Sequence, residues 1–285
     1  MSELNPIEDS LQFSHEAMNT TFTLRFRGLD KDGAPGVARE CFERIDRLES
    51  RLSRFAEASD ISRINSMQAG ETLYLSDDSH RCLMLALDAC ARTGGLFDIT
   101  LGTRIEHRKS GNDGPTPEIT GSLIIHPDVP AVTCSEPGRE LDLGGIGKGF
   151  ALDQLKELLV EWETEDALLA AGASSLLAIG PSAWPVDLTG DRESLRITLC
   201  DQALSASGTG IQGSHIIHPG GEDHAPAGSC KRVWVIAPTA ALAEIWSTAL
   251  MLVEPDEIPE IIAAEPEITT VYAEVQGVLR TFGPG

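Results

Sequence analysis

Apolar residues recur along this chain with two different spacings, and each spacing predicts a different kind of element. Over residues 22–27 apolar and polar side chains alternate, which predicts a half-buried β-strand. Over residues 37–55 apolar side chains return every three or four positions, which predicts a strongly amphipathic helix. A second helix is expected over about 78–92, where a Gly-Gly pair ends it.

The rest of the chain is richer in strands than in helices. Residues 106–121 are polar and rich in Gly and Pro, which predicts an exposed loop, and a helix of Ala and Leu is expected after Thr239. Further strands are predicted near 122–126, 131–134, 167–180 (two strands with a close turn), 195–199, 233–237, 268–275 and 278–282.

The strands come in adjacent groups, with four or five helices expected in all, rather than alternating one by one with helices. This order predicts an α+β fold with mostly antiparallel sheets and packed helices. No break in composition marks a linker, so residues 1–285 are predicted to form a single domain.

Charge changes the picture of what the protein binds. The chain of 285 residues is ordinary in its apolar content of 41%, yet its net charge is −22. Nucleic acids and anionic membranes are bound with an excess of Lys and Arg, so neither is an expected partner. An anionic nucleotide would need a cation placed locally beside it.

The cysteines and the N-terminal residues indicate the cellular compartment. Six cysteines are scattered and none forms Cys-x-x-Cys, which argues against a zinc knuckle or a redox pair and favours reduced thiols. The first residues lack a basic and apolar leader, and no apolar run reaches the length of a membrane span. We therefore expect a cytoplasmic protein without a membrane span.

The stretch from Arg139 to Leu155 combines features that suit an anion. Four glycines surround Lys148 and lead into a predicted helix. Glycines let the backbone approach an anion, and a helix N-terminus offers unpaired N–H groups and a partial positive charge. The stretch is therefore predicted to be a phosphate cradle, and the alternative is a tight turn whose glycines serve packing.

Two familiar phosphate-binding motifs are excluded here. A P-loop requires Ser or Thr after its Lys and a Gly six positions before it, but Gly149 follows Lys148 and the upstream position holds Asp142. A dinucleotide fingerprint would require Gly where Leu152 stands.

Other polar residues are candidates for chemistry. Asp98 lies in an apolar run and needs a partner if it is buried. His215 and His218 flank a pair of isoleucines. Glu244 and Thr248 lie four apart on one predicted helix face, with Ser247 beside them. A carboxylate and a hydroxyl suit Mg²⁺, although an ordinary side-chain hydrogen bond explains the same spacing.

These segments resemble a known family through their order along the chain. In sequence they read Met-x-Thr-Thr-Phe, Leu-Ser-x-Phe, Ser-x-Ile-Ser-x-Ile-Asn, Gly-Gly-x-Phe-Asp-x-Thr-x-Gly, Leu-Asp-Leu-Gly-Gly-Ile-x-Lys-Gly-Phe-Ala-x-Asp, His-Ile-Ile-x-Pro and Trp-Ser-Thr-Ala-Leu. Together they resemble the ApbE family of FAD:protein FMN transferases from about Met18 to Val253.

The resemblance implies an activity and a site. The family uses Mg²⁺ to cleave FAD and transfers FMN to a Thr or Ser of a target flavoprotein, on two related halves of the T-fold type. The residues implied at the FAD site are Met18, Phe55, Phe97, Asp98, Ile99, Asp142, Lys148, His215 and Ile216. The Gly145 carbonyl, Glu244 and Thr248 would hold the metal with Ser247 nearby, and His215 would handle the proton of the acceptor hydroxyl.

The chain departs from the family pattern at the metal and histidine motifs. Glu244 stands where the family has Asp, and His218 and Gly221 stand where the family's histidine motif has an Asp and a Thr. Three functions therefore remain: an active FMN transferase, a flavin-binding homologue that serves as carrier or regulator, and an FAD pyrophosphatase.

Overall fold

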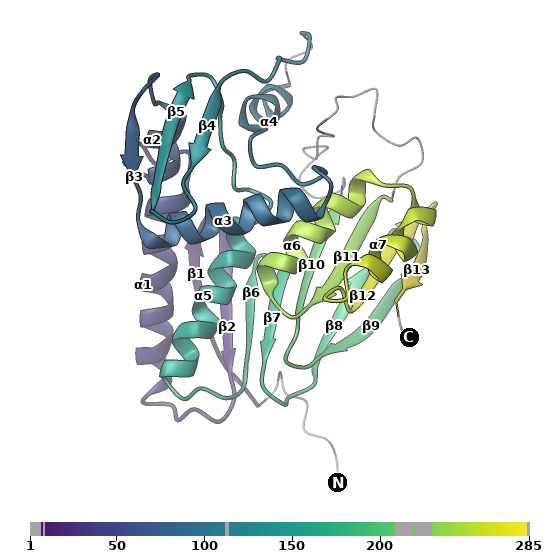
Figure 1. Cartoon of the computed structure of the whole chain (residues 1–285). Helices are drawn as coiled ribbons and strands as arrows, with labels where there is room; N and C mark the ends of the chain where they lie inside the picture. The colour runs from purple at the N-terminus through teal and green to yellow at the C-terminus, as the bar shows by residue number, and fades with distance from the viewer. Residues whose placement is uncertain (1–6, 8, 112–113, 209–218, 220–229, 284–285) are drawn as a thin grey trace.

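The computed structural model describes residues 7, 9–111, 114–208, 219 and 230–283. Its centre is an eight-stranded sheet in which every pair of neighbouring strands is antiparallel (Figure 1). In spatial order the strands are β1 (Leu11–Ala17), β2 (Thr20–Phe26), β6 (Ala167–Ala171), β7 (Ser175–Ile179), β10 (Ala203–Gly208), β11 (Arg232–Ala237), β12 (Thr270–Val275) and β13 (Val278–Phe282). The predicted α+β class with antiparallel sheets is confirmed.

The sheet consists of two runs of four strands with the same layout. In the first run two strands are followed by helices and then by two more strands, and the second run repeats this order. The runs join where β7 pairs with β10, from Ser175↔Ser205 to Leu177↔Ala203. The layout agrees with two related halves. That residues 1–285 form one domain built from such halves stays a prediction.

Three helices cover one face of the sheet: α1 (Ala34–Leu52), α5 (Gly147–Glu161) and α6 (Ala240–Ala249) (Figure 1). They form with it one large core, in which Leu24 of β2, Leu48 of α1 and Leu152 of α5 are fully buried. The helix α1 carries its apolar residues at the predicted spacing, so its inward face follows from the sequence.

The opposite face of the sheet is covered by the hairpin of β8 (Trp184–Thr189) and β9 (Ser194–Leu199). Side chains alternate between the two faces along a strand. In β11, Val233 and Val235 therefore belong to the helical core, whereas Trp234 and Ile236 belong to a second, smaller core with Trp184 of the hairpin.

A separate layer is formed mainly by the segment that follows α1, in the upper part of Figure 1. It contains a three-stranded sheet in the order β3 (Thr72–Tyr74), β5 (Ala131–Glu136) and β4 (Ser122–Ile125). The helices of this segment are α2 (Asp60–Asn65), α3 (Asp77–Arg92) and α4 (Gly102–Lys109). After α6 the chain forms the short helical turns η2 (Leu250–Leu252) and η3 (Pro255–Glu257) and the helix α7 (Ile258–Ala264).

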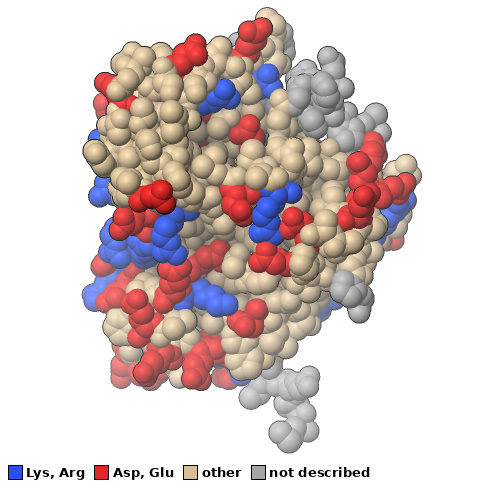
Figure 2. Space-filling model, in the orientation of Figure 1, with Lys and Arg blue, Asp and Glu red and all other residues tan. Residues whose placement is uncertain are grey.

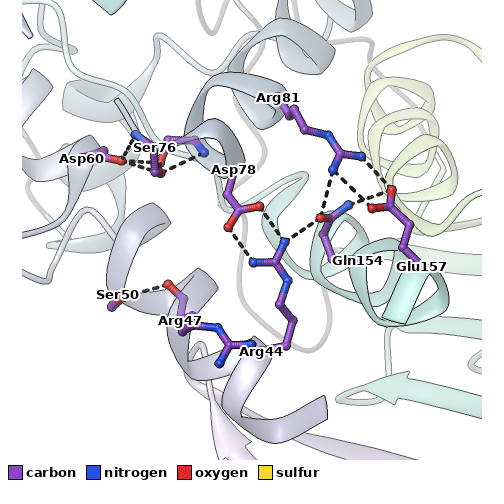
Figure 3. Close-up of polar contacts among 10 residues, drawn as sticks. Arg44, Arg47, Ser50, Asp60, Ser76, Asp78, Arg81, Gln154 and Glu157 are labelled. Atoms are coloured by element: carbon purple, nitrogen blue, oxygen red, sulfur yellow. Dashed lines mark hydrogen bonds and ion pairs between the residues drawn. The ribbon is translucent and has the colours of Figure 1, made fainter. Parts of the chain in front are cut away.

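A polar network ties α1, α3 and α5 together (Figure 3). Arg44 of α1 donates to both carboxylate oxygens of Asp78 on α3 at 2.6 Å, and to Gln154 Oε1 on α5 at 2.7 Å. Arg81 of α3 reaches Glu157 of α5 at 2.6 Å, and Gln154 donates to Glu157 at 3.1 Å. These bonds orient α5, whose first turn carries Lys148.

Several predictions of elements were wrong or incomplete. The amphipathic helix ends at Leu52, because Ser53 turns to an extended backbone, so Phe55 lies beyond it and is 77% exposed. Part of the predicted loop 106–121 belongs to α4, and residues 203–208, for which no strand was predicted, form β10. Seven α-helices lie within the described residues, not four or five. The sequence patterns also did not predict β1, β3, β8, α2 and α7, or the short helical turns η2 and η3.

The described part of the chain contains no helix whose length and apolar character would suit a membrane span.

The Arg44–Asp78 pair predicts a pH dependence of stability. The hydrogen bonds from Arg44 hold the pKa of the Asp78 carboxyl below its usual value. The stabilisation is therefore complete at neutral pH and is lost as the pH falls below about 4. Arg44→Met should lower the free energy of unfolding at pH 7 by about 2 kcal/mol and flatten its decline in acid, measured by urea unfolding at stepped pH.

Arg39→Met is the matched control on the same helix. Arg39 lies 3.9 Å from Glu43 and both side chains are exposed, so we expect a change below about 0.5 kcal/mol. Equal effects of the two substitutions would contradict the role of the buried network.

Candidate functional site

The segment that leads into α5 is held from both sides. Asn65 mimics a strand: its amide nitrogen donates to the Leu141 carbonyl at 3.0 Å and its amide oxygen accepts from the Leu141 N–H at 2.8 Å. The next residue, Asp142, accepts the Gly144 N–H at 2.7 Å and lies 3.5 Å from the Arg54 guanidinium. The Asp142 carboxylate therefore stabilises the glycine turn by its hydrogen bond to Gly144, and the charge of Arg54 balances its own.

Two of the glycines are required by close contacts. A Cβ on Gly145 would lie 3.0 Å from the Phe97 ring and 3.6 Å from Thr248 Oγ1. A Cβ on Gly149 would lie 2.6 Å from the Ala240 carbonyl carbon and 2.7 Å from Ala241 Cα. Packing therefore explains Gly145 and Gly149, whereas Gly147 faces open space.

Asp153, in the second turn of α5, bonds to the first turn of α6. Its two carboxylate oxygens accept the N–H groups of Ala240 at 2.8 Å and Ala241 at 2.9 Å, which would otherwise be unpaired at the start of α6. Burial raises the pKa of Asp153 to about 6. Thr239 completes the cap by accepting the Leu242 N–H at 3.3 Å.

This helix contact brings Lys148 and Glu244 together. Lys148 Nζ forms an ion pair with Glu244 Oε1, and the Gly149 N–H donates to Glu244 Oε2 at 2.6 Å. Glu244 is 4% exposed. The lysine-bearing turn and the acid of the distant helix, which are 96 residues apart in the chain, thus meet directly.

The hydroxyls beside Glu244 bond to the backbone. Ser247 and Thr248 donate to the Glu244 backbone carbonyl at 3.0 and 2.9 Å, not to its carboxylate. Ser207 of β10 lies 2.9 Å from Ser247 and 3.4 Å from Thr248. The hydroxyl of Thr248 is partly buried and Ser247 is fully buried beneath it.

A cavity of about 500 Å³ opens beside these groups. Eight of the predicted site residues line it: Phe97, Asp98, Ile99, Asp142, Gly145, Lys148, Glu244 and Thr248. The other walls are formed mainly by the ends of β10 and β11, by the turn between β6 and β7, and by residues of β8 and α4.

Three other predicted residues, Met18, Phe55 and Ser247, do not line the cavity. Met18 sits in the β1–β2 turn with a φ of 49° and packs against the core, and Ser247 is buried beneath Thr248. Phe55 is outside the cavity lining, with the Arg54 guanidinium 5.0 Å above its ring. His215 and Ile216 lie outside the described residues.

The sequence patterns missed several residues that build the site. Arg54, Asn65 and Asp153 all lie inside the motifs, yet their partners are far away in the chain. An acid or amide in an apolar helix or turn signals that it needs a partner, but the signal does not identify that partner.

The fold and the site together define an α+β protein with a cavity between a lysine-bearing glycine turn and the acid and hydroxyl of a second helix. Residues 18–272 match the sequence model of the ApbE family, and the chain belongs to that family.

Known relatives and solved structures agree with this assignment. The chain is 24% identical over 299 residues to the FAD:protein FMN transferase of Klebsiella pneumoniae, covering 90% of this chain and 83% of that protein. It is 28% identical over 228 residues to the Rhodobacter capsulatus protein of the same name, covering 70% of this chain and 43% of the relative. The fold is similar to the flavinyl transferase ApbE of Pseudomonas stutzeri in its apo form, with a TM-score of 0.81, 21% identity and coverage of 96% and 94%. For the flavin transferase ApbE of Vibrio cholerae the TM-score is 0.79, at 18% identity and 96% coverage of both chains.

The two glycines of α5 offer a direct test of the helix contact. Gly149→Ala should lower the free energy of unfolding by about 2–3 kcal/mol, because the new methyl group meets the backbone of α6. Gly147→Ala should be neutral or slightly stabilising, since its methyl group meets nothing within 4 Å and Ala favours the helix. Thermal unfolding of both variants measures this, and a stable Gly149→Ala protein would contradict the close approach.

Proposed function

We propose that this chain is an FAD:protein FMN transferase that moves FMN from FAD to a Thr or Ser hydroxyl of a target flavoprotein. The observation that carries the proposal is the meeting of Lys148, the glycine turn and the Glu244–Thr248 pair at one cavity. Membership of the ApbE family supports the choice of FAD as the substrate, as do relatives that bear this name.

Different residues of the cavity lining would contact different parts of FAD. Phe97 and Ile99 offer apolar surface for the flavin, and Asp98 and Asp142 offer carboxylates for its polar edge or ribose. Lys148 would face the diphosphate, whereas the N–H groups of Gly147, Gly149 and Phe150 in the first turn of α5 already donate within the protein. His215 and Ile216 are assigned to the same site, and His215 to proton transfer, by the family resemblance alone.

The oxygen ligands at this site would suit a Mg²⁺ ion that is also coordinated by phosphate oxygens of the substrate. Within the described residues, no group of three or more His, Cys, Asp or Glu side chains could hold a metal by itself. Glu244 carries one acceptor bond on each oxygen, from Lys148 and Gly149, and each carboxylate oxygen has a further lone pair. Glu244, Thr248 and the Gly145 carbonyl would hold a Mg²⁺ that completes its shell with phosphate and water.

The protein contributes mainly position and charge to phosphoryl transfer. The bound metal would neutralise charge on the diphosphate. Lys148, already fixed by Glu244, needs little reorganisation to stabilise a phosphate oxygen. The acceptor hydroxyl would come from the target protein, and the leaving group would be AMP.

The partner and location proposals rest on charge and cysteine state. Figure 2 shows acidic and basic side chains intermixed over much of the visible face, in a chain whose net charge is −22. This charge favours a protein partner rather than a nucleic acid. All six cysteines are free, four of them buried, which supports a reducing cytoplasmic location.

One observation favours a second candidate, a flavin-binding homologue without transferase activity. Glu244 is one methylene longer than the acid of the family pattern, and both of its oxygens already accept protein hydrogen bonds. Mg²⁺ tolerates little deviation from its ligand distances of about 2.0–2.1 Å, so the altered acid would impair the metal.

Incubation with FAD, Mg²⁺ and a peptide that carries the acceptor motif of a target flavoprotein tests the proposal. We expect the peptide to gain the mass of one FMN and free AMP to appear, and chelation of the metal to abolish both products. Binding of FAD without turnover would support the second candidate. Release of FMN and AMP without a labelled peptide would indicate a pyrophosphatase.

Replacement of Lys148 tests the phosphate cradle separately. Lys148→Met should weaken FAD affinity by about tenfold or more, because the diphosphate loses a charged donor. Lys156→Met is the control on the same helix, where Lys156 pairs with exposed Asp201 at 3.1 Å and faces away from the cavity lining. Flavin fluorescence titration measures both affinities, and equal values for Lys148→Met and the wild type would disprove the cradle.

A further inference from the structure

Two basic residues besides Lys148 line the cavity: Lys109 at the end of α4, and Arg232. Arg232 begins β11, and its side chain is 19% exposed. No motif in the sequence drew attention to it.

The Arg232 guanidinium is fixed through a single nitrogen. Nη1 donates to Glu274 Oε2 at 2.5 Å and to Asp191 Oδ1 at 2.8 Å. Glu274 is fully buried, and its other oxygen accepts the Asp191 N–H at 2.8 Å. Nε and Nη2 of Arg232 have no hydrogen-bond partner within the described part of the chain, so two donors of a rigid planar group remain for a ligand.

The arginine stem runs across a glycine close to the candidate metal residues. A Cβ on Gly208 would lie 2.9 Å from Arg232 Cγ, so a larger residue there would displace the stem. The preceding residue, Ser207, contacts the Thr248 hydroxyl at 3.4 Å. Arg232 therefore packs beside Gly208, and the neighbouring residue Ser207 contacts the Thr248 hydroxyl. This places Arg232 close to Thr248 at the cavity wall.

A purely structural role explains only part of this arrangement. Glu274 needs one cationic donor, which Nη1 supplies, and a lysine could do the same. The group of Arg232, Lys231, Asp191 and Glu274 is neutral overall, so it offers directed N–H donors rather than a net positive field. Such donors recognise an oxyanion at short range.

We infer that Arg232 binds a phosphate group of the nucleotide through Nε and Nη2, opposite the contribution of Lys148. This inference rests on the proposed function, because it assigns a contact to the same substrate. A planar guanidinium matches two oxygens of one phosphate, and a position near Thr248 places that phosphate beside the metal ligands.

Arg232→Lys tests the inference while preserving a cation for buried Glu274. With Mg²⁺ present, we expect the affinity for FAD to fall about tenfold and the affinity for riboflavin, which has no phosphate, to stay unchanged. Lys231→Gln is the matched control, since Lys231 also pairs with Asp191 but does not line the cavity. It should bind both flavins as the wild type does.

A second variant protects the test from a folding defect. Arg232→Gln combined with Glu274→Gln removes both charges together, and thermal unfolding would show that each variant is folded. The expected result is again a loss of affinity confined to FAD.

Three results would overturn the inference: unchanged FAD affinity in both variants, equal losses for FAD and riboflavin, or a rise confined to the KM of the acceptor peptide. The last would assign Arg232 to an acidic side chain of the acceptor. A wild-type chain that binds no FAD would instead overturn the proposed function, and the inference with it.

Discussion

The contact between the first turns of α5 and α6 is the constraint on which the site depends. Gly149 lets the two backbones approach more closely than any side chain would permit. Asp153 then satisfies two N–H groups at the start of α6, which would be costly to bury unpaired. With the helices in this position, Glu244 lies beside Lys148, and the cavity lies next to both.

Two of the basic side chains that line this cavity, Lys148 and Arg232, are held by buried acids. Lys148 pairs with Glu244, Arg232 with Glu274, and Arg54 with Asp142 behind the glycine turn. Pairing offsets the cost of removing each charge from water, and it fixes each donor in direction. A chain with a net charge of −22 can therefore present directed positive groups to an anionic substrate. Acidic side chains are therefore compatible with such a site, and Figure 2 shows many of them on the visible face.

Local patterns predicted most elements because the forces that form them are local. The spacing of apolar residues defined α1 and α3, and alternation defined β2, β9 and β11. The segment 203–208 escaped prediction because Ser and Gly have little strand preference. It becomes β10 because β7 and β11 bond to it on both sides. The exposed Phe55 shows the converse: the apolar spacing continues for one turn beyond the helix end.

Within the site, the sequence by itself determined which chemical groups are available: a lysine in a glycine turn, and an acid and a hydroxyl four residues apart on a helix. It also supported the family assignment, since the order of motifs survives at low identity. Only the tertiary structure decided which groups meet. The pairing of Lys148 with Glu244, the cap from Asp153 to α6 and the anchoring of Arg232 by Glu274 all join distant segments. Such contacts depend on how helices and sheet pack, and packing is set by the shape of the whole core rather than by any local pattern.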